Sequence, residues 1–271
     1  LHRTLSWTMD YKKLGDADVE VPEVGLGTAH YTAGPGPLRE GISAGAFLVD
    51  TAEIYGTEDQ VGAAAVGMRS DIFIASKVSP AHFGHDDLIA AAEASLKRLG
   101  TDYIDLYQLH QPTAEIPIAE TMGAMGRLVD QGKVCYVGVS NFSVAQLAEA
   151  QSASNKKIVS NQVQYHLAER AIEDELLPYC QQHDVTIIAY SPLGFGMGKL
   201  KAQLRPGIME EVANAVGKTE AQVALNWCIS KENVIAIPKS NSADRVRENC
   251  GASGWRLSGD HMQLLDQGVL L

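Results

Sequence analysis

The chain has 271 residues, and 22 Lys and Arg against 33 Asp and Glu give it a formal net charge of −11. Such an acidic chain lacks the broad basic surface that nucleic-acid binding requires, so we expect no nucleic-acid partner. No apolar stretch reaches the roughly 20 residues needed to cross a bilayer, so we expect no membrane partner either. Hydrophobic residues make up 45% of the chain and no linker divides it, which predicts one globular domain over residues 1–271.

The first residues and the cysteines indicate the cellular setting. Residues 1–7 contain no apolar stretch of the kind found in a secretory signal. The four cysteines, Cys135, Cys180, Cys228 and Cys250, form no C-x-x-C pair. We therefore expect buried, reduced thiols in a cytoplasmic protein.

Short β-branched or apolar runs alternate with helical, alanine-rich stretches along the chain. The eight runs are Glu23–Thr28, Phe47–Asp50, Ile72–Lys77, Tyr103–His110, Val134–Ser140, Ile158–Gln162, Thr186–Tyr190 and Val234–Pro238. Strands separated by helices of this length form right-handed βαβ units and a parallel sheet. Eight such units in about 250 residues predict a closed (β/α)8 barrel. The alternative, an open doubly wound sheet, requires a third glycine that is missing from the turn at Gly25–His30.

The stretches around these runs predict helices and one hairpin. The main helical stretches are Asp86–Leu99, Ile118–Gln131, Val144–Ala153, Ile172–His183, Glu220–Ser230 and Ser258–Gly268, the last with a serine N-cap. Before the first barrel strand, Tyr11–Gly15 and Val19–Val21 flank a turn and predict a β-hairpin. We expect this hairpin to lie across the bottom of the barrel.

Four chemically matched side chains follow three consecutive strands. Asp50 ends the second strand and Tyr55 comes shortly after it, while Lys77 and His110 end the next two. Active sites of such barrels lie at the C-terminal ends of the strands, so these side chains should be neighbours. A nearby ammonium lowers the pKa of a phenol, an acid holds the ammonium in place, and an imidazole can share the proton. Such a site suits reduction of a carbonyl group by an external hydride donor.

Each of these residues also has an ordinary structural explanation. Asp50 could cap a helix, Lys77 could be a paired or surface charge, His110 a core histidine and Tyr55 a packing residue. All four explanations would have to coincide at predicted strand ends, which favours the functional interpretation.

Longer motifs support the functional interpretation of these four residues. They are Asp50–Gly56 followed by Glu58, Val137–Phe142, Asn161–His166, Tyr190–Gly194 and Ile237–Ser240. With these motifs in family order, the chain resembles the aldo-keto reductase superfamily over nearly its whole length. The resemblance implies a catalytic tetrad of Asp50, Tyr55, Lys77 and His110. It makes Tyr55 the general acid in reduction and the general base in oxidation.

The resemblance also implies a nicotinamide cofactor. It assigns Ser140, Asn141 and Gln162 to the carboxamide, Tyr190 to ring stacking, Ser191, Leu193 and Gly194 to the pyrophosphate, Lys239, Ser240 and Arg245 to the adenosine 2′-phosphate, and Glu248 and Asn249 to the adenine. The residues themselves predict a helix from near Ala243, capped by Asn241 or Ser242, whose N-terminus favours phosphate. Arg247 is interpreted as part of a solvated face. The pattern implies NADPH, with NADH binding more weakly.

The substrate side of the site is expected to be shallow and open. Gln111 stands where the family often has a tryptophan after the catalytic histidine, and the neighbouring loops are short. The side chains we expect near the substrate are His30, Tyr31, Phe83 and Gln111, together with Trp7. An open pocket favours breadth over tight selection.

These expectations describe an NADPH-dependent oxidoreductase that reduces aldehydes, with ketones and dicarbonyls as further candidates. A cofactor-binding regulatory subunit on the same scaffold is a second interpretation, and a lyase or aldolase with Lys77 as Schiff-base amine is a third. The third leaves several residues without a purpose: Ser140, Asn141, Gln162, Lys239 and Ser240. No histidine pair or Cys/His cluster has ligand spacing, so we expect no metal. We expect a monomer that acts on a small carbonyl or alcohol.

Overall fold

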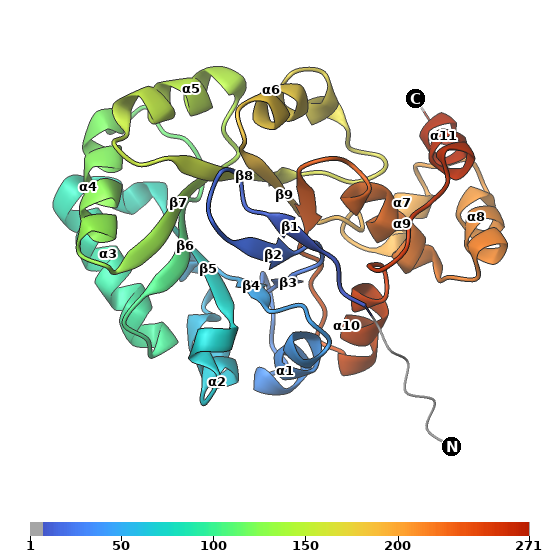
Figure 1. The fold of residues 1–271 in the computed structure, drawn as a ribbon, viewed down its shortest axis with the longest axis horizontal. Coiled ribbons are helices and arrows are strands. Elements are labelled where there is room, and N and C mark those ends of the chain that lie inside the picture. The colour runs from blue at the N-terminus through green and yellow to red at the C-terminus, as the bar shows by residue number, and fades with distance from the viewer. Residues whose placement is uncertain (1–7, 271) are drawn as a thin grey trace.

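The computed structural model describes residues 8–270, so the predicted pocket residue Trp7 lies outside the described residues. Eight strands form one sheet in which each strand pairs in parallel with its neighbour in sequence (Figure 1). The strands are β3 (Leu26–Gly27), β4 (Leu48–Asp50), β5 (Phe73–Val78), β6 (Ile104–Leu109), β7 (Val134–Ser140), β8 (Ile158–Gln164), β9 (Thr186–Tyr190) and β10 (Val234–Ala236). Each falls largely within one of the eight runs predicted from the sequence.

Hydrogen bonds between the first and last strands close the sheet. The Gly25 N–H donates to the Ala236 carbonyl at 2.8 Å, and the Ala236 N–H donates to the Glu23 carbonyl at 2.9 Å. A further bond at 3.1 Å joins the Gly27 N–H to the Pro238 carbonyl. These contacts and the eight parallel strands confirm the predicted (β/α)8 barrel.

Helices surround the barrel, and α7, α8, α9 and α11 gather on one side of it (Figure 1). The helices are α1 (Pro35–Ser43), α2 (Glu58–Ala65), α3 (His85–Leu99), α4 (Ile118–Asp130), α5 (Val144–Ala153), α6 (Leu176–Gln182), α7 (Met197–Lys201), α8 (Ile208–Val216), α9 (Glu220–Ile229), α10 (Ala243–Cys250) and α11 (Gly259–Gln267). Both α5 and α9 begin with a capping box, built on Ser143 and on Thr219. These boxes satisfy backbone N–H groups at the helix starts.

The predicted helices are present, with one difference. The stretch Ile172–His183 is split into a single 3₁₀ turn at Ala171–Glu173 and the shorter α6. The break lies at Glu175, whose backbone angles (φ −135°, ψ −50°) leave the helical region. The serine N-cap of α11 is confirmed, since the Ser258 hydroxyl accepts the His261 N–H at 3.2 Å.

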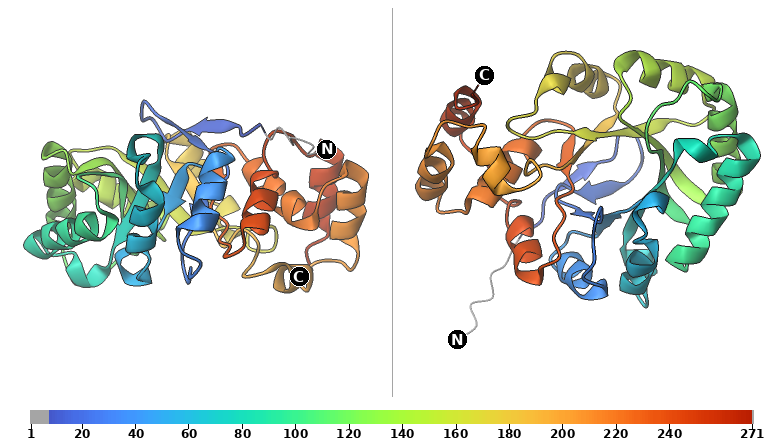
Figure 2. Two further views of the ribbon diagram at one scale, coloured as in Figure 1. Left: turned by 90° about the horizontal axis from the view of Figure 1, so that it is seen from below. Right: turned by 180° about the vertical axis from the view of Figure 1, so that it is seen from behind.

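The predicted hairpin closes the N-terminal end of the barrel (Figure 2). Strands β1 (Tyr11–Lys13) and β2 (Glu20–Pro22) pair antiparallel, and the buried Leu14 and Val21 pack into the apolar interior of the barrel. Gly15 sits at φ +57°, where an added Cβ would lie 2.6 Å from the Val159 carbonyl oxygen, so this close approach requires glycine. The closed bottom leaves the C-terminal ends of the strands as the accessible end.

The cysteines follow the prediction in part. All four thiols are free, and Cys180, Cys228 and Cys250 are buried. Cys135 is exposed, which contradicts its predicted burial, because it lies at the solvent-facing start of β7. Among residues 8–270, no helix has both the length and the apolar character needed to cross a bilayer.

Candidate active site

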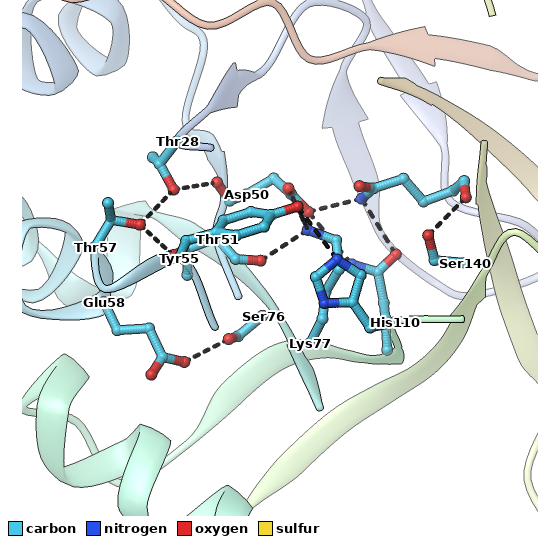
Figure 3. Close-up of polar contacts among 12 residues, drawn as sticks. Thr28, Asp50, Thr51, Tyr55, Thr57, Glu58, Ser76, Lys77, His110 and Ser140 are labelled. Atoms are coloured by element: carbon cyan, nitrogen blue, oxygen red, sulfur yellow. Dashed lines mark hydrogen bonds and ion pairs between the residues drawn. The ribbon is translucent and has the colours of Figure 1, made fainter. Parts of the chain in front are cut away.

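A cavity of about 1200 Å³ opens at the C-terminal ends of the barrel strands. Its walls include residues in or just after the C-terminal ends of β3, β4, β6, β7, β8, β9 and β10, and it extends to the N-termini of α9 and α10. The four predicted catalytic side chains meet at this end (Figure 3): Asp50, Tyr55 and His110 line the floor of the cavity, and Lys77 lies just beneath it.

A buried ion pair forms the base of this group. Lys77 Nζ lies 2.6 Å from Asp50 Oδ1 and donates to the Thr51 carbonyl at 2.8 Å. Both side chains of the pair are almost fully shielded from solvent. A buried charge requires a partner and further hydrogen bonds, and this pair has both. Lys77 therefore lies beneath the cavity wall, while Asp50 reaches it.

Tyr55 lies directly above the ammonium. Its hydroxyl oxygen is 3.5 Å from Lys77 Nζ, and the ammonium is 4.8 Å from the centre of the ring. The 3₁₀ turn Glu53–Tyr55 that carries it is anchored by the Glu53 carboxylate, which accepts the Ser79 N–H at 2.5 Å. The turn thus fixes the phenol over the ion pair.

The Lys77 ammonium alone would lower the pKa of Tyr55, but the pKa is raised. Burial raises the pKa of Tyr55 above its ordinary value, and the opposing effect of the Lys77 ammonium does not cancel this rise. The Asp50 carboxylate raises it further. The phenol therefore carries its proton at neutral pH, as a proton donor must.

His110 completes the group. Its Nε2 lies 3.4 Å from the Tyr55 hydroxyl, and the two rings meet edge to face. Burial, with a smaller contribution from the Lys77 ammonium, lowers the pKa of His110 to about 4. The imidazole is therefore neutral at physiological pH and can form a hydrogen bond with the Tyr55 hydroxyl without adding charge to the site.

Short polar side chains line the neighbouring part of the cavity. The Asn141 Nδ2 donates to the His110 carbonyl at 3.2 Å, and the Tyr190 hydroxyl donates to Asn141 Oδ1 at 3.1 Å. The Ser140 hydroxyl donates to the Gln162 carbonyl at 2.8 Å. Asn141 adopts a positive φ of 61°, a conformation that asparagine tolerates better than most residues. These amide and hydroxyl groups can both donate and accept, as binding of a ligand amide requires.

The far end of the cavity is suited to an anion. Helix α10 begins there, and the Ser242 hydroxyl caps it by accepting the Arg245 N–H, as one of the two predicted caps. Lys239 and Arg245 line the cavity, and within the described chain neither forms an ion pair. Arg247 instead pairs with Glu40 and Asp244 on the surface. Two uncommitted cations at a helix N-terminus form an anion-binding environment.

The cavity brings most of the predicted binding residues together. Those on its wall are Ser140, Asn141, Gln162, Tyr190, Ser191, Leu193, Lys239, Ser240, Arg245, Glu248 and Asn249, together with the substrate-side residues His30 and Gln111. Gly194 does not line it; it lies in a tight turn, in which its N–H donates to the Ser191 carbonyl at 2.8 Å.

Two predicted substrate residues are also misplaced. Tyr31 is buried and donates its hydroxyl to the Gly34 carbonyl at 2.6 Å. Phe83 is buried in the apolar layer between sheet and helices. Both side chains therefore pack into the fold instead of facing the cavity.

Sequence reasoning missed several residues of the site. The buried Gln108 donates to Asp50 Oδ2 at 3.3 Å, and Thr219–Ala221 supplies a wall of the cavity. Glu58 is buried behind the site, where it accepts from Ser76 at 2.5 Å and pairs with Arg98. The available signals were a glutamine within the apolar run Tyr103–His110 and the motif position Glu58, to which no role was assigned from the sequence. Within residues 8–270, no three His, Cys, Asp or Glu side chains gather as metal ligands.

A phenol beside an ammonium–carboxylate pair and a neutral imidazole, at the mouth of a (β/α)8 barrel, defines an acid–base enzyme site. Comparison with known proteins identifies the family. The sequence profile described as Aldo/keto reductase family matches residues 36–269. The chain belongs to this family and is an enzyme of it.

Three relatives illustrate the similarity. The methylglyoxal reductase YeaE of Escherichia coli is 40% identical over 261 residues, covering 92% of each chain. The glyoxal reductase of Bacillus subtilis is 34% identical, covering 92% of this chain and 89% of the relative. An aldo-keto reductase from Klebsiella pneumoniae, crystallised with NADPH, is 39% identical with a TM-score of 0.89, covering 96% of this chain and 95% of the other.

Proposed function

We propose that the protein is an NADPH-dependent reductase of small aldehydes, and of α-oxoaldehydes in particular, with Tyr55 as the general acid. The observation that carries the proposal is the position of the Tyr55 hydroxyl, 3.5 Å from Lys77 Nζ and 3.4 Å from His110 Nε2 at the floor of the cavity. This arrangement can deliver a proton to an oxygen atom that enters the cavity.

We infer that the cavity holds a nicotinamide adenine dinucleotide phosphate along its length. Asn141, Ser140 and Gln162 would hold the carboxamide, and the uncommitted Lys239 and Arg245 would hold the 2′-phosphate. The bound cofactor supplies a hydride for the carbonyl carbon. NADPH in the structure of the Klebsiella pneumoniae relative supports this assignment.

The side chains of the protein then supply the proton for the substrate oxygen. Tyr55 is protonated at neutral pH because burial keeps its pKa high. As it gives its proton to the substrate oxygen, the Lys77 ammonium stabilises the resulting phenolate, and Asp50 holds Lys77 in place. His110, neutral and within reach of the hydroxyl, orients the substrate oxygen. In alcohol oxidation the same phenolate acts as the base.

The substrate class is supported by the relatives and by the wall of the cavity. Two relatives are named for methylglyoxal and glyoxal, both small dicarbonyls. Beside His110 the wall carries the polar Gln111, and Ala29 and His30 lie on the wall after β3. A small, polar dicarbonyl suits such a wall better than a bulky apolar aldehyde.

The lyase or aldolase interpretation is disfavoured by the surroundings of Lys77. A Schiff-base amine must reach the substrate as a free amine. Lys77 has no exposed surface and donates to Asp50, Thr51 and Tyr55.

We also propose that the protein acts as a cytoplasmic monomer without a nucleic-acid partner, in keeping with its net charge of −11. Light scattering at micromolar concentration tests the oligomeric state.

The test is consumption of NADPH and of NADH with methylglyoxal, glyoxal and a panel of simple aldehydes. We expect turnover with NADPH by the wild type, and loss of turnover in Tyr55→Phe, which keeps the ring but has no proton to give. A fluorescence titration of NADPH should show binding by both proteins. Wild-type binding without turnover of any carbonyl would favour the regulatory interpretation.

A further inference from the structure

A glutamine lies in the middle of the apolar strand β6. Gln108 is completely buried and stands between the buried Tyr107 and Leu109. Burying an amide costs free energy unless its donors and acceptor find partners. The partners of Gln108 therefore indicate why the barrel holds an amide at this position.

These partners belong to the two functional parts of the site. Gln108 Nε2 donates to Asp50 Oδ2 at 3.3 Å, and its Oε1 lies 3.5 Å from Gln162 Nε2. Gln162 Nε2 also donates to Asp50 Oδ2, at 2.7 Å. The side chain of Gln108 thus contacts both the carboxylate that holds Lys77 and the amide that would bind the cofactor carboxamide.

The barrel is shaped to accommodate this contact. Asp50, Gln108 and Gln162 come from the alternate strands β4, β6 and β8, an arrangement typical of the side-chain layers inside such barrels. On β7, Gly138 pairs in register with Gln108, and an added Cβ there would lie only 2.9 Å from Gln108 Cγ. The missing side chain at Gly138 leaves room for the glutamine.

We propose that Gln108 is a positioning residue that keeps a hydrogen-bond donor on Asp50 Oδ2 while Gln162 serves the cofactor carboxamide. The proposal rests on the proposed function, because it takes Gln162 as a cofactor ligand. Asp50 Oδ1 is occupied by Lys77, so Oδ2 depends on the two glutamines. When the Gln162 amide also binds the cofactor, its hydrogen bond to Asp50 Oδ2 weakens. The Gln108 amide then supplies the donor that remains on this oxygen.

The negative charge of Asp50 affects the pKa of the Tyr55 phenol. Four polar groups face Tyr55 from the surrounding elements: Asp50 on β4, Lys77 on β5, His110 after β6 and Tyr190 on β9. Asp50 raises the pKa of Tyr55 and Lys77 lowers it. Removing a donor from Asp50 leaves more of its negative charge uncompensated, so the pKa of Tyr55 should rise.

Two variants test this role. Gln108→Met keeps the length of the side chain but removes its hydrogen bonds, and Gln108→Glu places a second carboxylate beside Asp50. The matched control is Ser160→Ala, because Ser160 is another buried polar residue of the barrel interior whose hydroxyl has no partner among the described residues. The control should leave turnover unchanged.

We expect kcat of Gln108→Met to fall about tenfold, the size of one lost hydrogen bond to a charged group, with little change in KM for the carbonyl. In alcohol oxidation, where Tyr55 acts as base, the pH midpoint of kcat should rise from wild type to Gln108→Met and further to Gln108→Glu. A purely structural role would lower stability without this ordered shift.

A readout independent of turnover separates this inference from the proposed function. Ultraviolet titration of tyrosine ionisation in the cofactor-free protein, compared with the same variants in a Tyr55→Phe background, reports the phenol of Tyr55 directly. Thermal unfolding confirms which variants are folded, and Gln108→Glu retains the side-chain shape if Gln108→Met does not fold. A Tyr55 midpoint that is equal in wild type and in the folded variants would overturn the positioning role, whether or not the wild type reduces a carbonyl.

Discussion

The two ends of the cavity differ in how their charges are satisfied. At the barrel floor, the Lys77 ammonium and the Asp50 carboxylate are buried and paired at 2.6 Å. At the start of α10, Lys239 and Arg245 are exposed and form no ion pair within the described chain. The ion pair at the barrel floor is therefore already formed before a ligand binds. At the start of α10, two positive charges remain available to bind an anionic ligand.

This difference separates the roles of the two ends. Substitutions at the floor should alter both the free energy of unfolding and the rate, because they disturb a buried network. Substitutions at the α10 end should alter cofactor affinity and leave the fold unchanged.

Lys77→Met should lower kcat by about a thousandfold, because the phenolate of Tyr55 loses its stabilising charge. The same change leaves Asp50 buried without its cation, which should lower the free energy of unfolding by about 3–5 kcal/mol. Urea unfolding and NADPH consumption measure the two effects. The double variant Asp50→Asn/Lys77→Met should regain stability without activity, and an active Lys77→Met enzyme would contradict the assignment.

Arg245→Ala should raise the dissociation constant of NADPH by about tenfold, because a charge-assisted contact to phosphate is lost. The dissociation constant of NADH should change little, since NADH lacks the 2′-phosphate. Arg247→Ala is the matched control on the same helix, because Arg247 is already paired with Glu40 and Asp244. Fluorescence titration of the wild type and of both variants with each cofactor measures the six constants. Equal weakening of both cofactors by Arg245→Ala would remove the 2′-phosphate assignment.

The smallest expected effect concerns the acid stability of the fold. His110 has its pKa lowered from 6.5 to about 4, so between these values the unfolded chain binds a proton that the folded protein does not. The contribution of His110 should therefore lower the free energy of unfolding as the pH falls from 6.5 towards 4. Urea unfolding across this range should give a shallower pH slope for His110→Asn. An identical slope in the variant would show that His110 is not held neutral in the folded protein.

The sequence predicted the regular elements well because their signals are local. Runs such as Ile158–Gln162 carry the strand pattern in their own residues, and Ser242 and Ser258 indicate where α10 and α11 begin. The break at Glu175 has a local cause in Pro178, which lies inside the predicted stretch Ile172–His183. Proline has no N–H to donate to the preceding turn, so it is tolerated only in the first turn of a helix, and α6 accordingly begins at Leu176.

Residues near the site were harder to predict where their role depends on tertiary packing. Tyr31 and Phe83 lie close in sequence to strand ends, yet their side chains turn into the apolar layer behind the cavity. The pKa of Tyr55 rises where Lys77 alone predicted a fall, because the extent of burial is set by the whole fold. The partners of Gln108 lie far from it in the chain, so its sequence position does not reveal them.

The most direct test of the account is a single turnover by rapid mixing. Wild type and Tyr55→Phe, each preloaded with NADPH, are mixed with methylglyoxal, and the loss of NADPH absorbance is followed. We predict rapid oxidation of the bound cofactor by the wild type, and oxidation about a thousandfold slower by Tyr55→Phe despite equal cofactor binding. Equal rates in the two proteins would contradict the assignment of Tyr55 as the proton donor.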